Sequence, residues 1–332
     1  MADILYIVVP CYNEEDVLPE TSRRLKEKLT NLIEHGLASE QSRILFVDDG
    51  STDSTWSFIE RSHRAAEIFS GLKLSRNRGH QNALLAGLMT AMSLADVTVS
   101  LDADLQDDIG CLDEFMWKYY DGCDIVYGVR ADRTTDSFFK RWSAHTYYNF
   151  MKKLGVQIIY NHADYRLMSR RALLGLSEFR EVNLFLRGMI PLLGYKTGTV
   201  EYTRKKRLAG TTKYPLRKMF SFAWEGISSF TVRPIRYITV FGVVMLLGSV
   251  LGLIYTLCRN FSAEGISLPS VCLSSIWFIG SLQLLAIGLV GEYVGKTYME
   301  VKKRPRYIVE KILDEALENK QTDKSSRHEN NY

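Results

Sequence analysis

Apolar and polar residues alternate along the first 130 residues in a pattern that predicts strands separated by helices. Short runs rich in Val, Ile and Leu are followed by longer stretches in which apolar residues recur at helical spacing. Strands are expected over residues 4–10, 43–49, 71–75, 97–104 and 124–130, with helices near 14–34, 54–69, 79–94 and 109–120. Such alternation is typical of βαβ units. It predicts an α/β fold whose mostly parallel, Rossmann-like sheet is covered by helices on both faces.

Each of the first four predicted strands is followed directly by a polar segment. These segments read PCYNEE, DDGSTDST, RNRGHQ and DADLQDD. The carboxyl ends of parallel strands lie at one edge of a sheet, and ligands of open α/β sheets bind there. We therefore expect the four segments to form one site.

The pattern changes after residue 130. Residues 131–213 are less regular. Over residues 214–236 apolar side chains recur at helical spacing beside basic ones, which predicts an amphipathic helix at a membrane surface; a helix packed on the domain is the alternative. Two long segments, 237–258 and 265–291, contain no charged side chain. Each supplies the about 20 apolar residues that span a bilayer. Transmembrane helices are thus expected over 237–258 and 269–292, with a pair of buried core helices as the alternative.

Basic residues flank this pair of apolar segments on both outer sides. Arg233 and Arg236 precede the pair, and a basic tail over residues 293–332 follows it, whereas the connecting loop has only Arg259, offset by Glu264. Positive residues favour the cytoplasmic side of a membrane. The sequence thus predicts a multi-pass protein of the plasma (inner) membrane whose N-terminal domain, residues 1–213, is cytoplasmic.

Composition and charge limit the class of protein further. The chain has 332 residues and a net charge of +4, which is too small to indicate nucleic acid as a partner. Its five cysteines are scattered without a CxxC pair, so neither a disulfide framework nor a zinc site is expected. The N-terminus lacks a basic leader and is not expected to be a signal peptide.

Four aspartates lie within seven residues at the end of the fourth predicted strand. Like charges this close repel each other unless something compensates them, and a bound cation is the obvious candidate. Asp102 and Asp104, two apart at a strand end, are expected to point the same way, and Gln106 could add a carbonyl oxygen. Hard oxygen ligands suit Mg²⁺ or Mn²⁺, with substrate phosphates completing the coordination. We predict a metal and diphosphate site, with a solvated acidic loop as the alternative.

The other polar segments carry side chains suited to a nucleotide. Asp48 and Asp49 could accept hydrogen bonds from a base or a ribose, and Tyr12 could stack on a base. Arg78 precedes a helix whose N-terminus could hold negative charge. His80 alone is interpreted as a polar loop residue rather than a catalytic one.

The segments VVPCYNEE, VDDGSTDST, RNRGHQNALLAG, DADLQDD and DYRLMSR, in this order and at this spacing, resemble the inverting family-2 glycosyltransferases of GT-A fold. More narrowly, the chain resembles the membrane-anchored polyprenyl-phosphate branch, which includes dolichol-phosphate-mannose synthase and bacterial relatives that glycosylate undecaprenyl phosphate. The resemblance covers the whole chain, including the C-terminal pair of apolar segments. Single motifs are weak, but the set is highly specific.

The resemblance implies roles for residues on the acceptor side. Asp164 and Arg166 resemble the pair proposed for catalysis. Arg130, in YGVR, and Arg141, in FKRWSAH, resemble the arginines that receive the lipid phosphate. A phosphate monoester is already an oxyanion, so we expect Asp164 to orient Arg166 or the acceptor rather than to remove a proton.

On the donor side, the segment RLAGTTKY matches the basic loop that closes over the phosphates, with a threonine in place of the usual serine. DDIGC replaces the usual prolines after the acidic motif, which suggests a looser loop there. The set expected to bind the nucleotide sugar is Pro10, Tyr12, Glu14, Asp48, Asp49, Arg78, Asp102, Arg207 and Lys213, and the set expected to bind the metal is Asp102, Asp104 and Gln106.

The resemblance also implies a reaction and its partners. A sugar would pass from a nucleotide sugar, UDP-glucose or UDP-N-acetylglucosamine, to undecaprenyl phosphate at the cytoplasmic membrane face, with inversion and with Mg²⁺ or Mn²⁺. The implied partners are the lipid bilayer, further copies of the chain in a homotetramer, a flippase and an extracytoplasmic glycosyltransferase.

Two other functions fit the sequence less well. A processive polysaccharide synthase carries a QxxRW motif, whereas the only RW here is Arg141-Trp142, and the residue three positions earlier is Phe138. A non-catalytic membrane scaffold would be expected to have lost Asp102, Asp104 or the basic loop, and all are present.

Overall fold

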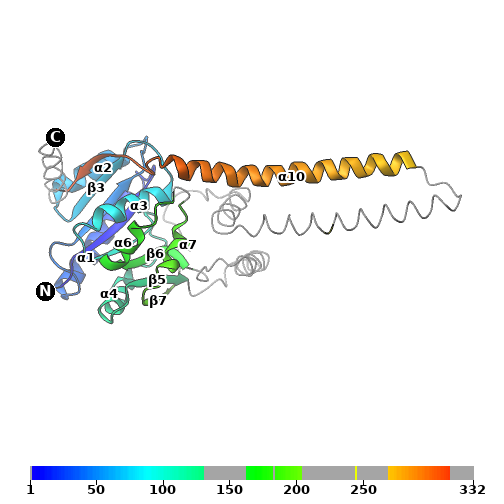
Figure 1. The fold of residues 1–332 in the computed structure, drawn as a ribbon. Helices are drawn as coiled ribbons and strands as arrows, with labels where there is room; N and C mark the ends of the chain where they lie inside the picture. The colour runs from blue at the N-terminus through cyan, green and yellow to red at the C-terminus, as the bar shows by residue number, and fades with distance from the viewer. Residues whose placement is uncertain (1, 131–161, 182–183, 204–243, 245–267, 315–332) are drawn as a thin grey trace, which may run out of the picture. The chain divides into compact units, whose positions relative to one another are not determined.

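The computed structural model describes residues 2–130, 162–181, 184–203, 244 and 268–314 (Figure 1). The chain divides into two compact units. The first comprises Met1–Phe150, Gln157–Tyr214 and Pro305–Tyr332, and the second comprises Met151–Val156 and Pro215–Arg304. Every predicted site residue that the structure describes belongs to the first unit.

An eight-stranded sheet in the order β7-β5-β6-β4-β1-β2-β3-β8 forms the centre of the first unit. β4, β1, β2 and β3 pair in parallel, which confirms the predicted parallel sheet. β5 and β7 pair in parallel with each other, whereas β6 is antiparallel to β4 and β5, and β8 is antiparallel to β3. The strands are β1 Leu5–Cys11, β2 Arg43–Asp48, β3 Phe69–Leu74, β4 Val97–Ser100, β5 Ile125–Arg130, β6 His162–Ser169, β7 Thr197–Tyr202 and β8 Val309–Leu313.

Helices cover both faces of this sheet, as the alternation predicts. α1, α2 and α4 belong to the apolar core on the face that carries Leu5 and Ile7. α3 packs on the opposite face so closely that a Cβ added at Gly87 would come within 2.4 Å of Val8. Strands buried on both faces read as continuous apolar runs. The helices are α1 Leu18–Glu34, α2 Thr55–Ala65, α3 His80–Ala91, the 3-10 helix η1 Ile109–Cys111, α4 Leu112–Tyr120, α6 Arg170–Ser177, α7 Leu186–Met189 and the 3-10 helix η2 Ile190–Leu193.

β6 is a strand that the apolar pattern does not predict. It lies between β4 and β5 and is antiparallel to both. Its first residues therefore lie at the edge where the parallel strands end. The pairing of Ser100 with Arg166 sets the register, and this register brings Asp164 to the edge that carries the four polar segments.

β8 lies beyond the predicted domain limit at residue 213, within the expected basic tail. It pairs antiparallel with β3 at one edge of the sheet. Asp314, just after β8, is buried and accepts hydrogen bonds from the Tyr6 hydroxyl at 3.1 Å and from Ser70 Oγ at 2.7 Å. Part of the predicted tail is thus a component of the sheet, and the predicted limit is corrected accordingly.

In the second unit the structure describes one long helix, α10 (Leu268–Lys302), which contains the second predicted membrane segment, 269–292. No helix within the described residues is both long enough and apolar enough to cross a membrane. The predicted amphipathic helix over 214–236 lies outside the described residues, and so does the first predicted membrane segment over 237–258, apart from residue 244.

Candidate functional site

The polar segments after β1 and β2 hold each other through hydrogen bonds. Thr52 N donates to Asn13 Oδ1 at 2.9 Å, and Glu14 N donates to Thr55 Oγ1 at 2.9 Å. Tyr12, in the same segment, is 41% exposed. The two segments therefore form one ordered surface at the carboxyl edge of the sheet, with the Tyr12 ring accessible to a ligand.

Asp48 is fully buried at the end of β2, beside the buried Pro10 of β1, which pairs with Val47. Its Oδ1 accepts a hydrogen bond from Ser51 N at 3.1 Å, and its Oδ2 has no hydrogen-bond partner within the described residues. Burial raises the pKa of this carboxyl, and the hydrogen bonds from Ser51 oppose that rise. A buried carboxylate oxygen without a donor is costly. Asp48 Oδ2 therefore fits a ligand that donates a hydrogen bond, such as a base N–H or a ribose hydroxyl.

Asp49 ties the segment after β3 to the end of β2. Its two carboxylate oxygens accept hydrogen bonds from Arg78 N at 2.7 Å and from Gly79 N at 2.8 Å. Burial raises the pKa of Asp49 even though these two N–H groups favour its charged form. Arg78 Nε is buried and lacks a partner among the residues described. Asp49 thus has a structural partner on both oxygens and places Arg78 at the site.

Gly50 makes this close approach of two loops possible. It has φ +69°, and a Cβ added there would lie 2.6 Å from the backbone of Arg76. Gly50→Ala is expected to lower the free energy of unfolding by about 2 kcal/mol or more, because a left-handed alanine costs about 1–2 kcal/mol before any clash. Gly36→Ala is the matched control, since Gly36 has the same φ and nothing within 4 Å of an added Cβ.

Thermal or urea unfolding of the two variants measures this difference. Gly36→Ala should show only the backbone cost of about 1–2 kcal/mol. Equal losses of unfolding free energy for the two variants would show that a Cβ at position 50 meets no costly clash with the segment after β3.

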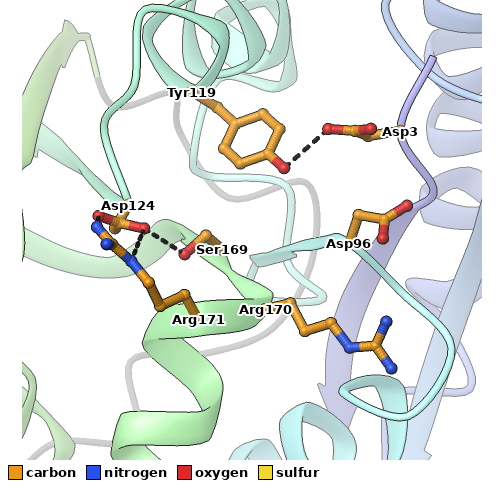
Figure 2. A pocket seen from close by; sticks show the side chains of 7 residues that line it. All are labelled: Asp3, Asp96, Tyr119, Asp124, Ser169, Arg170 and Arg171. Carbon is orange, nitrogen blue, oxygen red and sulfur yellow. Dashed lines mark hydrogen bonds and ion pairs between the residues drawn. The ribbon is translucent and has the colours of Figure 1, made fainter. Parts of the chain in front are cut away.

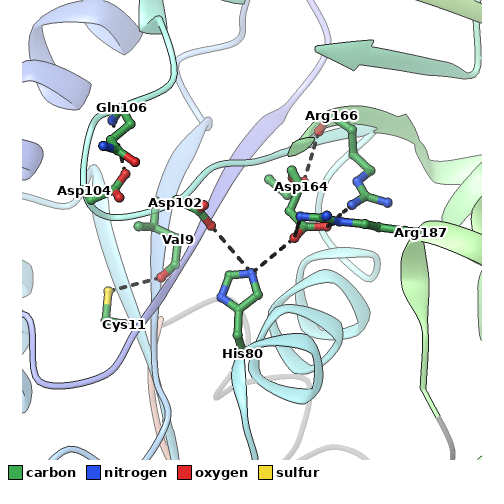
Figure 3. A network of polar contacts seen from close by, with 10 residues as sticks. Val9, Cys11, His80, Asp102, Asp104, Gln106, Asp164, Arg166 and Arg187 are labelled. Atoms are coloured by element: carbon green, nitrogen blue, oxygen red, sulfur yellow. Dashed lines mark hydrogen bonds and ion pairs between the residues drawn. The ribbon is translucent and has the colours of Figure 1, made fainter. Parts of the chain in front are cut away.

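The strand before the acidic segment ends earlier than predicted, because β4 ends at Ser100 rather than at residue 104. Asp102 and Asp104 therefore lie in a loop, and the alternation of a strand does not orient them. The Asp102 carboxylate lies 3.5 Å from His80 Nε2, whereas Asp104 Oδ1 accepts a hydrogen bond from Gln106 N at 3.1 Å (Figure 3). Gln106 itself is buried. The expectation that the two carboxylates point the same way is thus corrected.

Asp164, at the start of β6, is the centre of a charged network (Figure 3). Arg166 Nη2 donates to Asp164 Oδ1, and Arg187 donates to the two carboxylate oxygens from Nε at 3.2 Å and from Nη2 at 2.8 Å. His80 Nε2 lies 3.8 Å from Asp164 Oδ2 and so stands between Asp102 and Asp164. The structure brings the predicted pair Asp164 and Arg166 together with the predicted metal ligand Asp102.

The charges in this network keep Asp164 ionised. Burial by itself would raise the pKa of the Asp164 carboxyl, but the charges of Arg187 and Arg166 outweigh burial and hold the pKa well below its usual range. For Arg166, burial lowers the pKa, and the adjacent Asp164 charge opposes that shift. A carboxyl with a strongly lowered pKa is a poor general base.

His80 and Arg187 are two site residues that the sequence reading missed. His80, interpreted there as a loop residue, is the first residue of α3 and contacts carboxylates on two elements. Arg187 lies in the short helix α7, in a region read as irregular. No motif marks Arg187. The RNRGHQ segment was a usable signal for His80, because it follows a strand that ends at the site.

Arg130, at the end of β5, connects to the acidic segment through Tyr202. Arg130 Nε lies 3.4 Å from the Tyr202 hydroxyl, which is also hydrogen-bonded to Asp107. Burial raises the pKa of Tyr202, and the Asp107 charge adds to the rise. The remaining predicted site residues, Arg141, Arg207 and Lys213, lie outside the described residues.

A polar pocket opens at the opposite edge of the sheet, where β6 ends (Figure 2). Its acidic groups have partners within the chain: the Tyr119 hydroxyl donates to Asp3 at 2.8 Å, and Arg171 Nε and Ser169 Oγ donate to Asp124 at 3.0 and 2.8 Å. These pairs need no ligand, so the carboxyl edge remains the candidate site. The pocket is lined by Asp3, Asp96, Tyr119, Asp124, Ser169, Arg170 and Arg171.

Comparison with known proteins points to one family. Residues 6–175, which include β1 to β6, match glycosyl transferase family 2. The chain is 50% identical to the glycosyltransferase YkoT of Bacillus subtilis (strain 168), over 99% of this chain and 98% of that protein. It is 37% identical to the prophage bactoprenol glucosyl transferase homolog of Escherichia coli (strain K12), over 92% of this chain and 98% of that protein. It is 36% identical to the SfII prophage-derived bactoprenol glucosyl transferase of Shigella flexneri, over 92% of this chain and 97% of that protein.

Proposed function

This chain belongs to glycosyltransferase family 2 and has the GT-A fold, and from that premise we propose that it transfers a sugar from a UDP-sugar to undecaprenyl phosphate. The transfer inverts the anomeric carbon and uses a divalent cation. The relatives named bactoprenol glucosyl transferases support a polyprenyl lipid as the acceptor and glucose as the sugar, with N-acetylglucosamine as the alternative. The product is a polyprenyl-phosphate-linked sugar for cell-envelope glycosylation.

The observation that carries this proposal is the contact of His80 with both Asp102 and Asp164, at 3.5 and 3.8 Å. Asp102 follows β4 and belongs to the donor side, whereas Asp164 lies on β6 and belongs to the acceptor side. Transfer between two bound substrates needs their sites to be adjacent. Only the His80 side chain stands between Asp102 and Asp164, and this short separation fits that requirement.

A divalent cation at the acidic segment would be held by the carboxylate of Asp102 or of Asp104 and would share its coordination with a substrate. Both residues are partly exposed. In the described part of the chain, no group of three or more His, Cys, Asp or Glu side chains could hold a metal by itself, and Mg²⁺ commonly binds one or two carboxylates plus substrate phosphates. Gln106 N orients Asp104. When bound, the cation would neutralise charge on the departing diphosphate.

On the acceptor side the chain has to bring an anion to the sugar, and this task needs positive charge rather than a base. A phosphate monoester is already deprotonated enough to attack. We assign Asp164 the role of orienting Arg166, because its carboxylate is ionised and bonded to that guanidinium. Arg130 and Arg141 are assigned to the lipid phosphate, since arginine binds phosphate oxygens in a bidentate manner.

We also propose that the protein is anchored in the plasma membrane with the first unit on the cytoplasmic side. The uncharged segments 237–258 and 265–291 and their basic flanks support this placement. A lipid acceptor requires a site at the bilayer surface. Homotetramer assembly, a flippase and an extracytoplasmic glycosyltransferase are proposed as partners on the same resemblance.

A transfer assay with the purified full chain in detergent tests the proposal. Undecaprenyl phosphate and Mn²⁺ or Mg²⁺ are combined separately with UDP-glucose, UDP-N-acetylglucosamine, UDP-galactose and GDP-mannose, and the lipid fraction is analysed by mass. We expect a single lipid-linked sugar, formed from one UDP-sugar and abolished by EDTA. A folded protein that forms no such product from any donor would contradict the proposal, and a polymeric product would point to processive synthesis instead.

Asp48→Asn is expected to separate stability from donor binding. The variant should be at least as stable as the wild type at pH 7, because burying an amide costs less than burying an ionised carboxylate. Its KM for the UDP-sugar should rise about tenfold or more, through loss of a charge-assisted hydrogen bond.

The stability difference between these proteins should also depend on pH. The pKa of Asp48 is raised in the folded state, so the wild type loses stability as pH rises from about 4, the usual value, through the raised pKa. The stability advantage of Asp48→Asn should thus be larger at pH 7 than at pH 4. Urea unfolding at both pH values measures it, and a variant with unchanged KM would remove Asp48 from the donor site.

A further inference from the structure

His80 is held at the site by hydrogen bonds of both of its neighbours in the chain. Gly79 N donates to Asp49 Oδ2 at 2.8 Å, so the residue before His80 is bonded to the end of β2. On the other side, Gln81 Oε1 accepts a hydrogen bond from Leu186 N, at the start of α7, at 3.0 Å. The backbone position of His80 is therefore fixed from two sides without any contact by its own ring.

The imidazole ring of His80 makes no hydrogen bond to the residues that the structure describes. Its Nε2 lies 3.5 Å from Asp102 Oδ1 and 3.8 Å from Asp164 Oδ2. Both distances exceed the about 2.7–3.2 Å of a normal hydrogen bond between nitrogen and oxygen. The side chain is 41% exposed. His80 thus presents a polar ring, on a fixed backbone, to a ligand that enters the site.

The proposed reaction determines what lies beside this ring. Inversion requires the acceptor to attack the anomeric carbon from the side opposite to the departing diphosphate, so the sugar lies between the diphosphate and the acceptor. Asp102 is assigned to the diphosphate side and Asp164 to the acceptor side, and Figure 3 shows His80 between these two carboxylates. The ring of His80 is therefore next to the transferred sugar rather than next to the base of the nucleotide.

An imidazole and a sugar hydroxyl are chemically suited to each other. A neutral imidazole has one nitrogen that donates and one that accepts a hydrogen bond, and a hydroxyl group can do both. Hexoses differ in the position and orientation of their hydroxyl groups. A side chain in a fixed position distinguishes such sugars, because a site built to bond a hydroxyl rejects an analogue that lacks it.

We propose that His80 forms a hydrogen bond with a hydroxyl group of the transferred sugar and thereby helps to select that sugar. The inference rests on the proposed function, since it assigns a residue to the donor of that same reaction. The bonds of Gly79 and Gln81 fix where the ring stands. The ring in turn fixes the sugar between the two carboxylates, where the acceptor attacks it.

Calorimetric titration of the full chain in detergent, with Mn²⁺ and without an acceptor, tests this assignment. The ligands are UDP-glucose and UDP, which lacks the sugar. His80→Ala should raise the Kd for UDP-glucose about tenfold and leave the Kd for UDP unchanged. His80→Gln keeps a group that can donate or accept a hydrogen bond, so its Kd for UDP-glucose should fall between the two. A purely structural role of His80 would change both Kd values together.

Analogues of UDP-glucose that each lack one sugar hydroxyl identify the group that His80 contacts. The wild type should bind one of these analogues about tenfold more weakly than UDP-glucose. His80→Ala should bind that analogue and UDP-glucose equally, because the two changes remove the same hydrogen bond.

His35→Ala is the matched control. His35 is an exposed histidine that follows α1, and its Nδ1 lies 2.8 Å from Asn31 O. It contacts none of the residues assigned to the site. Its loss should leave the Kd values for UDP-glucose, UDP and the analogues unchanged.

Other outcomes overturn the inference in distinguishable ways. If the wild type forms the lipid-linked sugar and His80→Ala keeps the wild-type Kd for UDP-glucose, the assignment of His80 fails and the proposed function stands. An equal rise of the Kd for UDP would place His80 at the diphosphate, and a rise confined to the KM for undecaprenyl phosphate would place it at the acceptor. Both results contradict the inference.

The choice of donor does not affect the logic of the experiment. If the wild type transfers a UDP-sugar other than UDP-glucose, that donor and its deoxy analogues take the place of UDP-glucose in every titration. If the folded wild type transfers none of the four sugars, the proposed function fails and takes this inference with it.

Discussion

The Asp164→Asn variant is expected to lose transfer activity by about 100-fold or more while still binding the donor. Its carboxylate is the shared partner of Arg166 and Arg187. Asparagine keeps the shape of the side chain but removes the charge between the two guanidiniums. Both groups then repel each other and lose the positions that the acceptor requires. Measuring kcat with undecaprenyl phosphate, alongside calorimetric binding of the UDP-sugar, checks both parts.

The same variant should be less stable, and the loss should depend on pH. Removing one partner of a buried ion pair costs about 3–5 kcal/mol. The pKa of Asp164 is lowered in the folded state, so its stabilisation is complete above the usual aspartate pKa of about 4 and is lost as pH falls below that value. The stability gap between the wild type and Asp164→Asn should therefore be constant from pH 6 to 8 and shrink below pH 4.

The double variant Asp164→Asn with Arg187→Gln separates charge balance from function. It removes one negative and one positive group, so it should recover part of the lost stability without recovering activity. Activity of Asp164→Asn close to that of the wild type would rule out the orienting role. An acidic limb in the wild-type pH profile between pH 5 and 8, absent from Asp164→Asn, would instead make Asp164 a base.

The second large effect is expected for Asp102→Asn. Its carboxylate is proposed to coordinate the divalent cation, and an amide is a weaker, uncharged ligand. We expect kcat to fall by about 100-fold or more, and the Mn²⁺ concentration for half-maximal activity to rise by about tenfold or more. Titration of Mn²⁺ at saturating UDP-sugar measures both changes.

Two control variants make the result for Asp102 specific. Asp113→Asn removes a carboxylate on α4 that pairs with Lys28 Nζ at 2.5 Å, and it should leave the Mn²⁺ requirement unchanged. His80→Gln removes the contact between His80 and Asp102 without removing a proposed metal ligand, and it should also keep the Mn²⁺ requirement. An unchanged Mn²⁺ requirement in Asp102→Asn would contradict the metal assignment.

Much of the fold could be predicted because the parallel strands are buried on both faces. β1, β2 and β5 appear in the sequence as largely apolar runs, and the polar segments that follow the first four strands mark one edge of the sheet. β6 was missed because it alternates polar and apolar residues and contains the charged pair Asp164 and Arg166. β8 was missed because it lies far along the chain from its partner β3, and no local pattern reports such a pairing.

The site residues likewise fall into those that the sequence could identify and those that it could not. Asp48, Asp49, Asp102 and Asp104 could be singled out because each pair lies at the end of a predicted strand. His80 and Arg187 could not be assigned from residue type, because their roles depend on which carboxylates they meet across the sheet. One contact from His80 of α3 and two hydrogen bonds from the Arg187 guanidinium of α7 converge on Asp164.

The amino-acid order alone was enough to specify the parallel sheet, the edge that carries the site and the family resemblance. These features depend on short-range periodicity and on motifs read along the chain. The pairing of acidic and basic groups was decided only by the tertiary structure. The insertion of β6 between β4 and β5 sets which charges meet, and electrostatic effects follow distance in space rather than distance along the chain. The ionised state of Asp164, the bridging position of His80 and the orientation of Arg187 all follow from that one insertion.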